Sequence, residues 1–272
     1  MTPSGPRSTV ALVAGAGRLP AELAARLDAP LVCAPPGIAP DGLAVDVVFH
    51  VERLSPFLRM LGDRGIETVV MAGAIHRPRL DPALFDRETA ALVPDLLAAM
   101  AGGDDAALRW IIGLIEDYGL RVAGLSEVAP DLLAAPGILG ARSPSDAEAR
   151  DAGRGRAILA ALDAVDVGQG CVVASGLCLG VEALFGTDAM LADVARHRAT
   201  REPQAGGVFV KRAKAGQDLR ADLPAIGPGT VAAAQAAGLS GIALQAGRVV
   251  VLDREATIAA ADAAKIALWA EP

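Results

Sequence analysis

The chain has 272 residues, of which 53% are hydrophobic and 3% aromatic, and its formal net charge is -7. This length exceeds that of a usual single core and predicts two domains. An acidic chain with few aromatic side chains lacks both the basic face that binds phosphate backbones and the rings on which bases stack. Composition therefore argues against a nucleic-acid partner.

Short apolar runs alternate with helical patterns through the first half of the chain. The predicted strands are residues 10–14, 31–33, 45–50 and 68–72. The predicted helices are residues 21–27, 54–64, 88–100 and 104–118. Alternation of this kind predicts a parallel sheet wrapped by helices, which is a Rossmann-like α/β domain.

Prolines and glycines gather between residues 129 and 145 and indicate a linker, with the domain boundary near residue 135. We therefore expect domains at residues 1–134 and 135–272. In the second domain the predicted helices are residues 146–164, 188–197, 230–237 and 254–266. The predicted strands are residues 171–174, 177–181 and 207–211 and a strand pair within residues 241–252, so this domain has a mixed α/β pattern.

Three cysteines, Cys33, Cys171 and Cys178, lie in apolar, strand-like stretches. We expect buried thiols in a reducing compartment, because their number is odd and no CxxC pair occurs. No stretch approaches the roughly 20 apolar residues that span a bilayer. The expected location is the cytoplasm, with at most peripheral membrane contact.

The turn after the first predicted strand begins like a dinucleotide fingerprint. Gly15 and Gly17 precede a helix whose N-terminus could hold a phosphate. The third glycine is missing, and no acidic residue ends the second strand at Cys33, so the pattern does not favour NAD. A nucleotide phosphate site and a plain strand-to-helix turn both remain open.

A second candidate phosphate contact follows the strand at residues 68–72. Arg77 comes after His76, just beyond the carboxyl end of that strand, where ligands gather in open α/β sheets. Capping or ion pairing is an equally good role for Arg77.

Charged residues are concentrated between residues 208 and 230. Two of the three lysines, Lys211 and Lys214, occur there, and the third is Lys265. A compact ammonium suits point-charge contact with a phosphate oxygen, although a solvated strand edge is the alternative. Asp222 lies ahead of a bend stiffened by Pro224. A rigid carboxylate of this kind suits Mg²⁺, which uses one or two protein carboxylates together with water and substrate phosphate.

Other acidic residues stand at predicted helix starts. Asp104 and Asp105 open one helix after Gly103, and Thr187 and Asp188 open another. Capping of the helix N-terminus is the ordinary role of such residues, and metal binding is the alternative for the Asp pair.

Five motifs together resemble the LpxI family, and they occur in the same order along nearly the whole chain. They are GAGRLP at 15–20, GDDAALR at 103–109, DVGQ at 166–169, EA at 182–183 followed by GTDAM at 186–190, and KAGQDLRADLPAIGP at 214–228. The last motif is the most specific of the five, whereas a short piece such as Gly-Asp-Asp is common. Ala74 and Ala225 stand where the family often has a polar residue and Thr.

The resemblance implies a Mg²⁺-dependent hydrolase of lipid A synthesis that cleaves UDP-2,3-diacylglucosamine into UMP and 2,3-diacylglucosamine 1-phosphate (lipid X). It also implies a homodimer at the cytoplasmic face of the inner membrane, with the UDP side held by the first domain and the lipid by the second. A nucleotide-sugar or lipid-binding regulator without catalysis is the alternative function.

The same resemblance implies roles for individual side chains. Asp222 matches the family's essential acid and is the expected metal ligand, with Lys214 and Arg220 as further catalytic residues. Substrate contacts that the resemblance implies are Thr187, Asp188, Gln217 and Asp218, and the patterns described above add Gly15, Gly17, Arg77 and Lys211 as expected substrate contacts.

Overall fold

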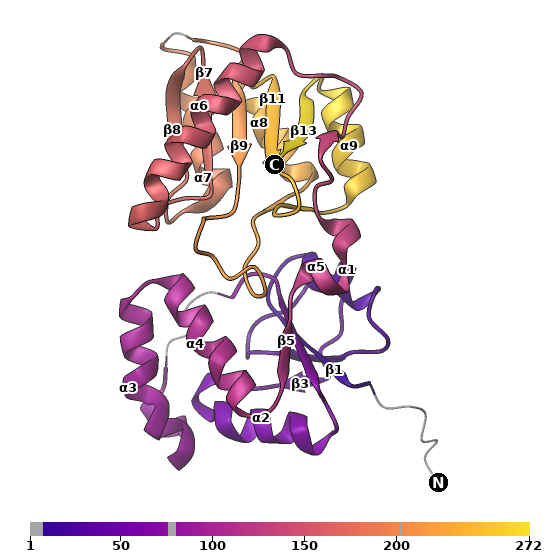
Figure 1. Cartoon of the computed structure of the whole chain (residues 1–272), viewed down its shortest axis with the longest axis vertical. Helices are drawn as coiled ribbons and strands as arrows, with labels where there is room; N and C mark the ends of the chain where they lie inside the picture. The colour runs from indigo at the N-terminus through magenta and orange to yellow at the C-terminus, as the bar shows by residue number, and fades with distance from the viewer. Residues whose placement is uncertain (1–7, 76–79, 202) are drawn as a thin grey trace. The chain divides into compact units, whose positions relative to one another are not determined.

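The computed structural model describes residues 8–75, 80–201 and 203–272. The chain forms two compact units (Figure 1). Unit 1 consists of Met1–Ala129 together with Asp218–Asp222, and unit 2 consists of Pro130–Gln217 together with Leu223–Pro272. A short segment from the second half of the sequence is therefore part of the first unit. The single boundary at residue 135 stays a prediction.

Unit 1 contains a five-stranded sheet in the order β3-β2-β1-β4-β5, and every pair of neighbours is parallel. The strands are β1 (Val10–Ala14), β2 (Leu31–Ala34), β3 (Val47–Val48), β4 (Thr68–Ala72) and β5 (Arg121–Ala123). Parallel strands require crossover connections, and helices lie in those from β1 to β2, from β3 to β4 and from β4 to β5, whereas β2 and β3 are joined by a loop. The predicted Rossmann-like parallel sheet is confirmed.

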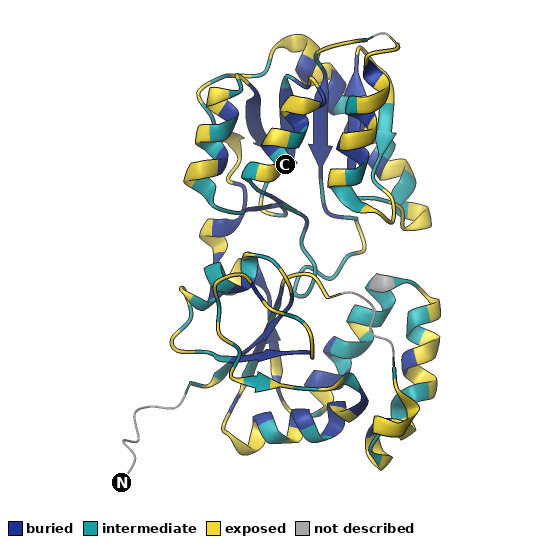
Figure 2. Cartoon of the chain, turned by 180° about the vertical axis from the view of Figure 1, so that it is seen from behind, coloured by how far each residue is buried: buried dark blue, intermediate teal, exposed yellow. Residues whose placement is uncertain are grey.

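The helices of unit 1 differ in how much of their surface they bury. They are α1 (Leu19–Ala24), α2 (Leu54–Asp63), α3 (Arg87–Ala101), α4 (Asp104–Asp117) and α5 (Leu125–Val128), with short 3-10 turns at Val51–Arg53 and Pro82–Leu84. Leu58 and Leu61 of α2 and Ile112 and Ile115 of α4 enter the core. Figure 2 shows buried, intermediate and exposed residues alternating along the helices. The 15-residue α3 buries Thr89 and Leu96, and its other side chains are half-buried or exposed.

Unit 2 contains a six-stranded mixed sheet in the order β6-β13-β11-β9-β7-β8. Its strands are β6 (Gly137–Ile138), β7 (Gly170–Ala174), β8 (Leu177–Val181), β9 (Val208–Lys211), β11 (Gly241–Gln245) and β13 (Ala267–Glu271). The three strands β9, β11 and β13 are parallel, whereas β6, β7 and β8 run antiparallel to their neighbours. A separate parallel pair joins β10 (Ala225–Ile226) to β12 (Val250–Val251).

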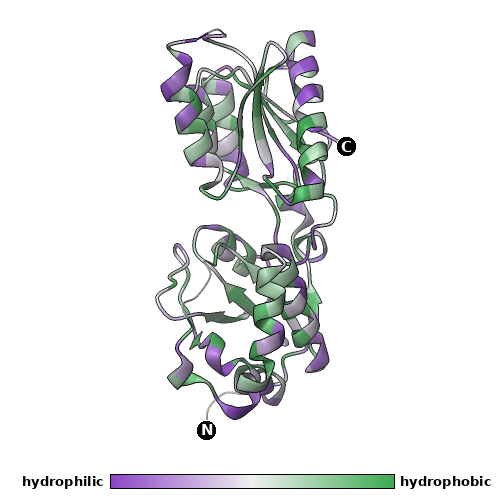
Figure 3. Cartoon of the chain, turned by 90° about the vertical axis from the view of Figure 1, so that its left-hand side faces the viewer, coloured by the Kyte–Doolittle hydropathy of each residue, from purple (hydrophilic) through white to green (hydrophobic). Residues whose placement is uncertain are grey.

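Both faces of the larger sheet are covered by helices. In β9, Val208 and Val210 pack on one face and Phe209 on the other, as the two-residue period of a strand requires. Helix α6 (Asp146–Leu162) covers the first face, while α7 (Gly186–Arg198), α8 (Pro228–Ala236) and α9 (Arg254–Ala263) cover the second. The strands accordingly are among the most hydrophobic segments of the unit (Figure 3). The mixed α/β prediction for the second half is confirmed.

Several details differ from the sequence predictions. Strand β13 follows α9, where the sequence predicted a helix ending the chain, because Lys265 adopts φ 56° and stops the helix. Strands β11 and β12 do not pair with each other; β11 lies between β9 and β13. The thiol of Cys178 is exposed on the edge strand β8, whereas Cys33 and Cys171 are buried as predicted.

Within the part of the chain that the structure describes, no helix combines the length and apolar character needed to cross a bilayer.

Candidate functional site

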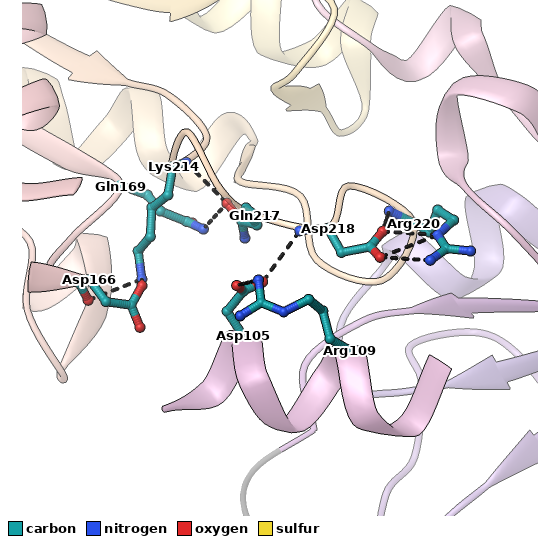
Figure 4. A network of polar contacts seen from close by, with 8 residues as sticks. All are labelled: Asp105, Arg109, Asp166, Gln169, Lys214, Gln217, Asp218 and Arg220. Carbon is teal, nitrogen blue, oxygen red and sulfur yellow. Dashed lines mark hydrogen bonds and ion pairs between the residues drawn. The ribbon is translucent and has the colours of Figure 1, made fainter. Parts of the chain in front are cut away.

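The segment that joins β9 to β10 carries five of the eleven predicted site residues, and Figure 4 shows Lys214, Gln217, Asp218 and Arg220 among them. Its residues up to Gln217 belong to unit 2, and Asp218–Asp222 belong to unit 1. Each part is fixed by its own set of polar contacts.

Lys214 and Gln217 are held by a turn of unit 2. The ammonium of Lys214 donates to Asp166 at 2.7 Å from Oδ1 and 3.2 Å from the carbonyl oxygen. The side-chain oxygen of Gln217 accepts from the Lys214 amide at 3.1 Å and from Gln169 Nε2 at 2.9 Å. Because the Lys214 side chain is 22% exposed, its charge is accessible as well as oriented. Asp166 adopts φ 56° at the end of a 3-10 turn (Asp163–Val165), which presents its carboxylate.

Lys211 occupies a different environment at the carboxyl end of β9. Its ammonium lies 2.7 Å from Glu182 Oε2 and 2.8 Å from Thr187 Oγ1, and its side chain is 4% exposed. The buried lysine therefore neutralises a half-buried carboxylate and ties the first turn of α7 to the sheet. Any contact between Lys211 and a substrate would have to compete with these two partners. Thr187 and Asp188 both lie in that first turn, and substrate contact by either residue stays a prediction.

In unit 1, Arg220 and Asp218 form a bidentate ion pair. Arg220 Nε lies 3.0 Å from Asp218 Oδ1 and Nη2 lies 2.8 Å from Oδ2, while Nη1 lies 2.6 Å from Glu116 Oε1. The hydrogen bond from Arg220 lowers the pKa of Asp218, and the same bond raises the pKa of Arg220. Both groups are therefore charged at neutral pH.

Other contacts attach this segment to the body of unit 1. The Asp218 amide donates to Asp105 Oδ1 at 3.3 Å, and Asp105 also pairs with Arg109 on the same helix (Figure 4). Gly124 touches the segment so closely that a β-carbon there would lie 3.1 Å from the Arg220 α-carbon. Ala221 packs against the apolar core of unit 1.

These contacts place Asp222 beside an apolar pocket of unit 1. The Asp222 amide donates to the Asp218 carbonyl at 3.4 Å and closes a turn. Asp222 and Ala221 line a pocket of about 390 Å³ whose remaining described lining comes from strands, helices and loops of the unit. Asp222 is half-buried.

The glycine turn after β1 is explained by close packing. The Gly15 amide donates to Ala72 O at 2.7 Å and the Ala16 amide to Ala74 O at 2.8 Å. A β-carbon on Gly15 would lie 2.5 Å from the carbonyl carbon of Gly73, so only glycine fits. Two of the amides that a phosphate would use are thus already bonded. Gly17 has φ 91°, a conformation that favours glycine, and its phosphate role stays a prediction.

His76 and Arg77 lie outside the described residues, so the role of Arg77 stays a prediction. Helix α4 begins at Asp104 after Gly103, which has φ 105°. Among the residues that the structure describes, no three His, Cys, Asp or Glu side chains form a metal-binding group. A single carboxylate such as Asp222 is compatible with Mg²⁺, which retains most of its waters.

Several residues that order the site were given no role from the sequence. Asp166, Gln169 and Glu182 lie in motifs that carried the family resemblance, so those motifs could have marked them as site residues. Glu116 and Gly124 have no local signal, because their importance arises from a segment about a hundred residues away.

Both halves of the chain match known family models. The LpxI N-terminal domain model matches residues 9–132, and the LpxI C-terminal domain model matches residues 135–269. The chain belongs to the LpxI family. A relative from Caulobacter vibrioides, called UDP-2,3-diacylglucosamine pyrophosphatase LpxI, is 37% identical over 265 residues. That alignment covers 92% of this chain and 93% of the relative, so the LpxI resemblance extends through both units.

Proposed function

We propose that this LpxI family member hydrolyses the pyrophosphate bond of UDP-2,3-diacylglucosamine to UMP and 2,3-diacylglucosamine 1-phosphate, a step of lipid A biosynthesis. The observation that carries the proposal is the Asp218–Asp222 turn, which is held by two ion pairs of Arg220 and by a hydrogen bond from the Asp218 amide to Asp105, and which ends in the half-buried Asp222. The name of the Caulobacter vibrioides relative supports the substrate.

The reaction adds water to one phosphorus of the P–O–P link and breaks the bond to the bridging oxygen. Two phosphomonoesters result, and a proton from the water must be accepted. Asp222 is the candidate for the proton acceptor or for the protein ligand of Mg²⁺. When bound, the ion would neutralise phosphoryl charge and lower the pKa of a coordinated water.

The cations assigned to the phosphates are Lys214 and Arg220. Their side chains are 22% and 40% exposed, and each is oriented by a carboxylate partner. An ammonium and a guanidinium both donate charge-assisted hydrogen bonds to phosphate oxygens, and the guanidinium can do so with two parallel donors. Each is proposed as a phosphate contact that stabilises charge as the bridging bond breaks.

We also propose that the protein acts as a homodimer in the cytoplasm, in peripheral contact with the inner membrane where a diacylated substrate resides. Sedimentation of the purified protein, alone and with phospholipid vesicles, tests the two statements separately. A monomer contradicts the first, and protein that stays in the supernatant contradicts the second.

The decisive assay incubates purified protein with UDP-2,3-diacylglucosamine and Mg²⁺, with EDTA as the control, and detects UMP and the sugar phosphate by mass spectrometry. We expect product with Mg²⁺ and none with EDTA. A folded protein that binds the substrate without turnover at any Mg²⁺ concentration would instead be a nucleotide-sugar or lipid-binding regulator.

A further inference from the structure

Two neighbouring residues of unit 2, Leu184 and Phe185, are the most exposed large apolar side chains in the part of the chain that the structure describes. They are 89% and 84% exposed. Both lie in the loop that joins β8 to α7 (Figure 1). A single exposed apolar residue is ordinary, whereas a contiguous exposed apolar patch marks a surface that interacts with a partner.

The loop that carries these two residues is braced on both sides. Lys211 Nζ lies 2.7 Å from Glu182 Oε2, which precedes the pair, and 2.8 Å from Thr187 Oγ1, which follows it. Between these two contacts the Gly186 amide donates to the Ala183 carbonyl at 3.0 Å and closes a turn. The two apolar side chains therefore extend from a turn whose base is fixed to the sheet.

A neighbouring turn of unit 2 adds two more exposed apolar residues. Val165 and Val167 are 64% and 38% exposed and precede β7. A β-carbon on Gly168 would lie 2.4 Å from the Glu182 carbonyl oxygen, so this turn lies against the end of β8. We call the four exposed residues of the two turns the apolar tip: Val165, Val167, Leu184 and Phe185.

Lys214 lies beside the apolar tip. Its ammonium is 2.7 Å from Oδ1 and 3.2 Å from the carbonyl oxygen of Asp166, which stands between Val165 and Val167 in the sequence. A cation assigned to the substrate phosphates is therefore next to an exposed apolar surface. A lipid bilayer has the matching arrangement, because its phosphates lie directly above its hydrocarbon.

The size of the apolar tip favours a bilayer over a second protein molecule. A stable protein interface buries about 800 Å² and roughly 20–30 residues on each partner. The tip consists of four side chains on two turns. Insertion into a bilayer requires no shape-complementary partner, and its strength increases with the apolar area that is buried.

The charges near the apolar tip favour a neutral lipid surface. Lys211 pairs with Glu182, and Lys214 pairs with Asp166, so these two cations carry their own counter-charges. The chain as a whole has a formal net charge of -7 and is not attracted to anionic lipids. Apolar burial is therefore the expected driving force for membrane binding.

We propose that the apolar tip inserts into the hydrocarbon boundary of a lipid bilayer and brings Lys214 to the level of the lipid phosphates. The inference rests on the proposed peripheral membrane contact and identifies the part of the molecule that makes it. A zwitterionic bilayer is sufficient for this contact.

Sedimentation with phosphatidylcholine vesicles tests the insertion. The double variant Leu184→Ser, Phe185→Ser should lower the partition coefficient at least about tenfold, because it removes the two largest apolar groups of the tip. Leu177→Ser is the matched control, since Leu177 is 57% exposed at the opposite end of β8, and it should bind like the wild type. Equal binding of the double variant and the wild type would overturn the proposal.

Ionic strength and lipid charge test the driving force. Raising the salt concentration from about 50 to about 500 mM should change the partition coefficient by less than about twofold, because apolar burial is not screened. Adding phosphatidylglycerol to the vesicles should not strengthen binding. Binding that requires phosphatidylglycerol and is lost in salt would overturn the proposal in favour of a cationic surface.

A fluorescent side chain reports insertion directly. The emission of Phe185→Trp should shift to shorter wavelength when phosphatidylcholine vesicles are added, whereas the emission of the control variant Leu177→Trp should not. Vesicle binding without a shift in Phe185→Trp would assign the membrane contact to another part of the molecule and overturn the proposal.

Sedimentation without lipid tests the second copy as the occupant. The double variant Leu184→Ser, Phe185→Ser should keep the assembly state of the wild type. A smaller species would show that the apolar tip joins two copies of the chain and would overturn the membrane assignment.

Turnover separates this proposal from the hydrolase proposal. The double variant should keep normal kcat and KM with a water-soluble substrate that bears two-carbon acyl groups. With UDP-2,3-diacylglucosamine embedded in phosphatidylcholine vesicles, its rate at low substrate should fall about tenfold. If the wild type binds vesicles through the tip but hydrolyses neither substrate, the tip stands and the hydrolase fails. If both proteins hydrolyse the embedded substrate equally well, the hydrolase stands and the tip fails.

Discussion

At the scale of single residues, Lys211 and Glu182 show how burial determines the role of a charge. Their side chains are 4% and 13% exposed and meet at 2.7 Å. Removing one partner of a buried pair leaves an uncompensated charge, whereas replacing both partners by apolar groups is often nearly neutral.

The first prediction concerns this pair. Lys211→Met should lower the free energy of unfolding by about 2–4 kcal/mol, because the half-buried Glu182 is left without its cation. The double variant Lys211→Met, Glu182→Met should recover most of that loss. Urea unfolding of both variants and the wild type measures the difference, and a double variant no more stable than Lys211→Met would contradict the account.

The second prediction concerns Asp222. Asp222→Asn preserves the size of the side chain but removes its charge, so kcat should fall about 100-fold or more while the thermal unfolding midpoint stays close to that of the wild type. The control is Asp193→Asn, which changes an exposed carboxylate on α7. Near-normal turnover in a folded Asp222→Asn protein would remove Asp222 from the reaction.

Sequence reasoning at this scale identified charged segments more readily than the partners of each charge. Lys211, Lys214, Asp218, Arg220 and Asp222 were all predicted site residues. The sequence could not show that Lys211 is buried against Glu182 or that Gly15 is packed on Gly73, because both facts depend on residues far apart in the chain.

At the scale of elements, helix α6 begins with a capping box. Ser145 accepts from the Glu148 amide, and Glu148 accepts from the Ser145 amide at 2.7 Å and from Arg142 at 2.6 Å. Burial alone would raise the pKa of Glu148, but hydrogen bonds led by Arg142 lower it to about 2. The ionised form is thus strongly favoured in the folded state.

The third prediction follows from this pKa. A depressed carboxyl pKa contributes stability above the unfolded value near 4.5, and that contribution is lost as the pH falls towards about 2. Glu148→Gln should therefore lower the free energy of unfolding by about 2–3 kcal/mol at pH 7. The gap between variant and wild type should shrink steadily below pH 4.5. Urea unfolding across this range measures it, and a constant gap would refute the linkage.

Most helices and strands were predictable because their apolar segments are long or are bounded by glycine and proline. Strand β1 (Val10–Ala14) and strand β4 (Thr68–Ala72) occur at their predicted residues. Strand β6 (Gly137–Ile138) was missed because two residues are too few to show the alternation of apolar and polar residues that marks a strand. Its pairing with β13 is set by the tertiary fold.

At the scale of the whole molecule, the chain passes between the units after Ala129, after Gln217 and after Asp222. The segment Asp218–Asp222 therefore depends on unit 1 for its conformation, and Gly124 lies directly against it. Sequence reasoning placed one boundary near residue 135 and could not anticipate the second and third crossings, since the contacts that create them involve single side chains.

The fourth prediction concerns Gly124. Its φ of -88° suits any residue, so a substitution acts through contact with Arg220 and not through backbone strain. Gly124→Ala should reduce kcat slightly and Gly124→Val more strongly, because the larger side chain displaces the Asp222 turn. Gly62→Ala on α2 is the control, since a β-carbon there meets no atom within 4 Å. Equal activity of all three variants would show that the turn does not depend on Gly124.

The three crossings also constrain how the two halves can be recombined between relatives. A chimaera with one joint near residue 130 would combine the first half of one protein with the Asp218–Asp222 segment of another. Mismatches at Asp105, Glu116 or Gly124 would then impair catalysis even though both halves fold correctly. Exchange of an intact unit 1 requires the five residues to travel with it, so compatible sequences at these distant positions should be inherited together.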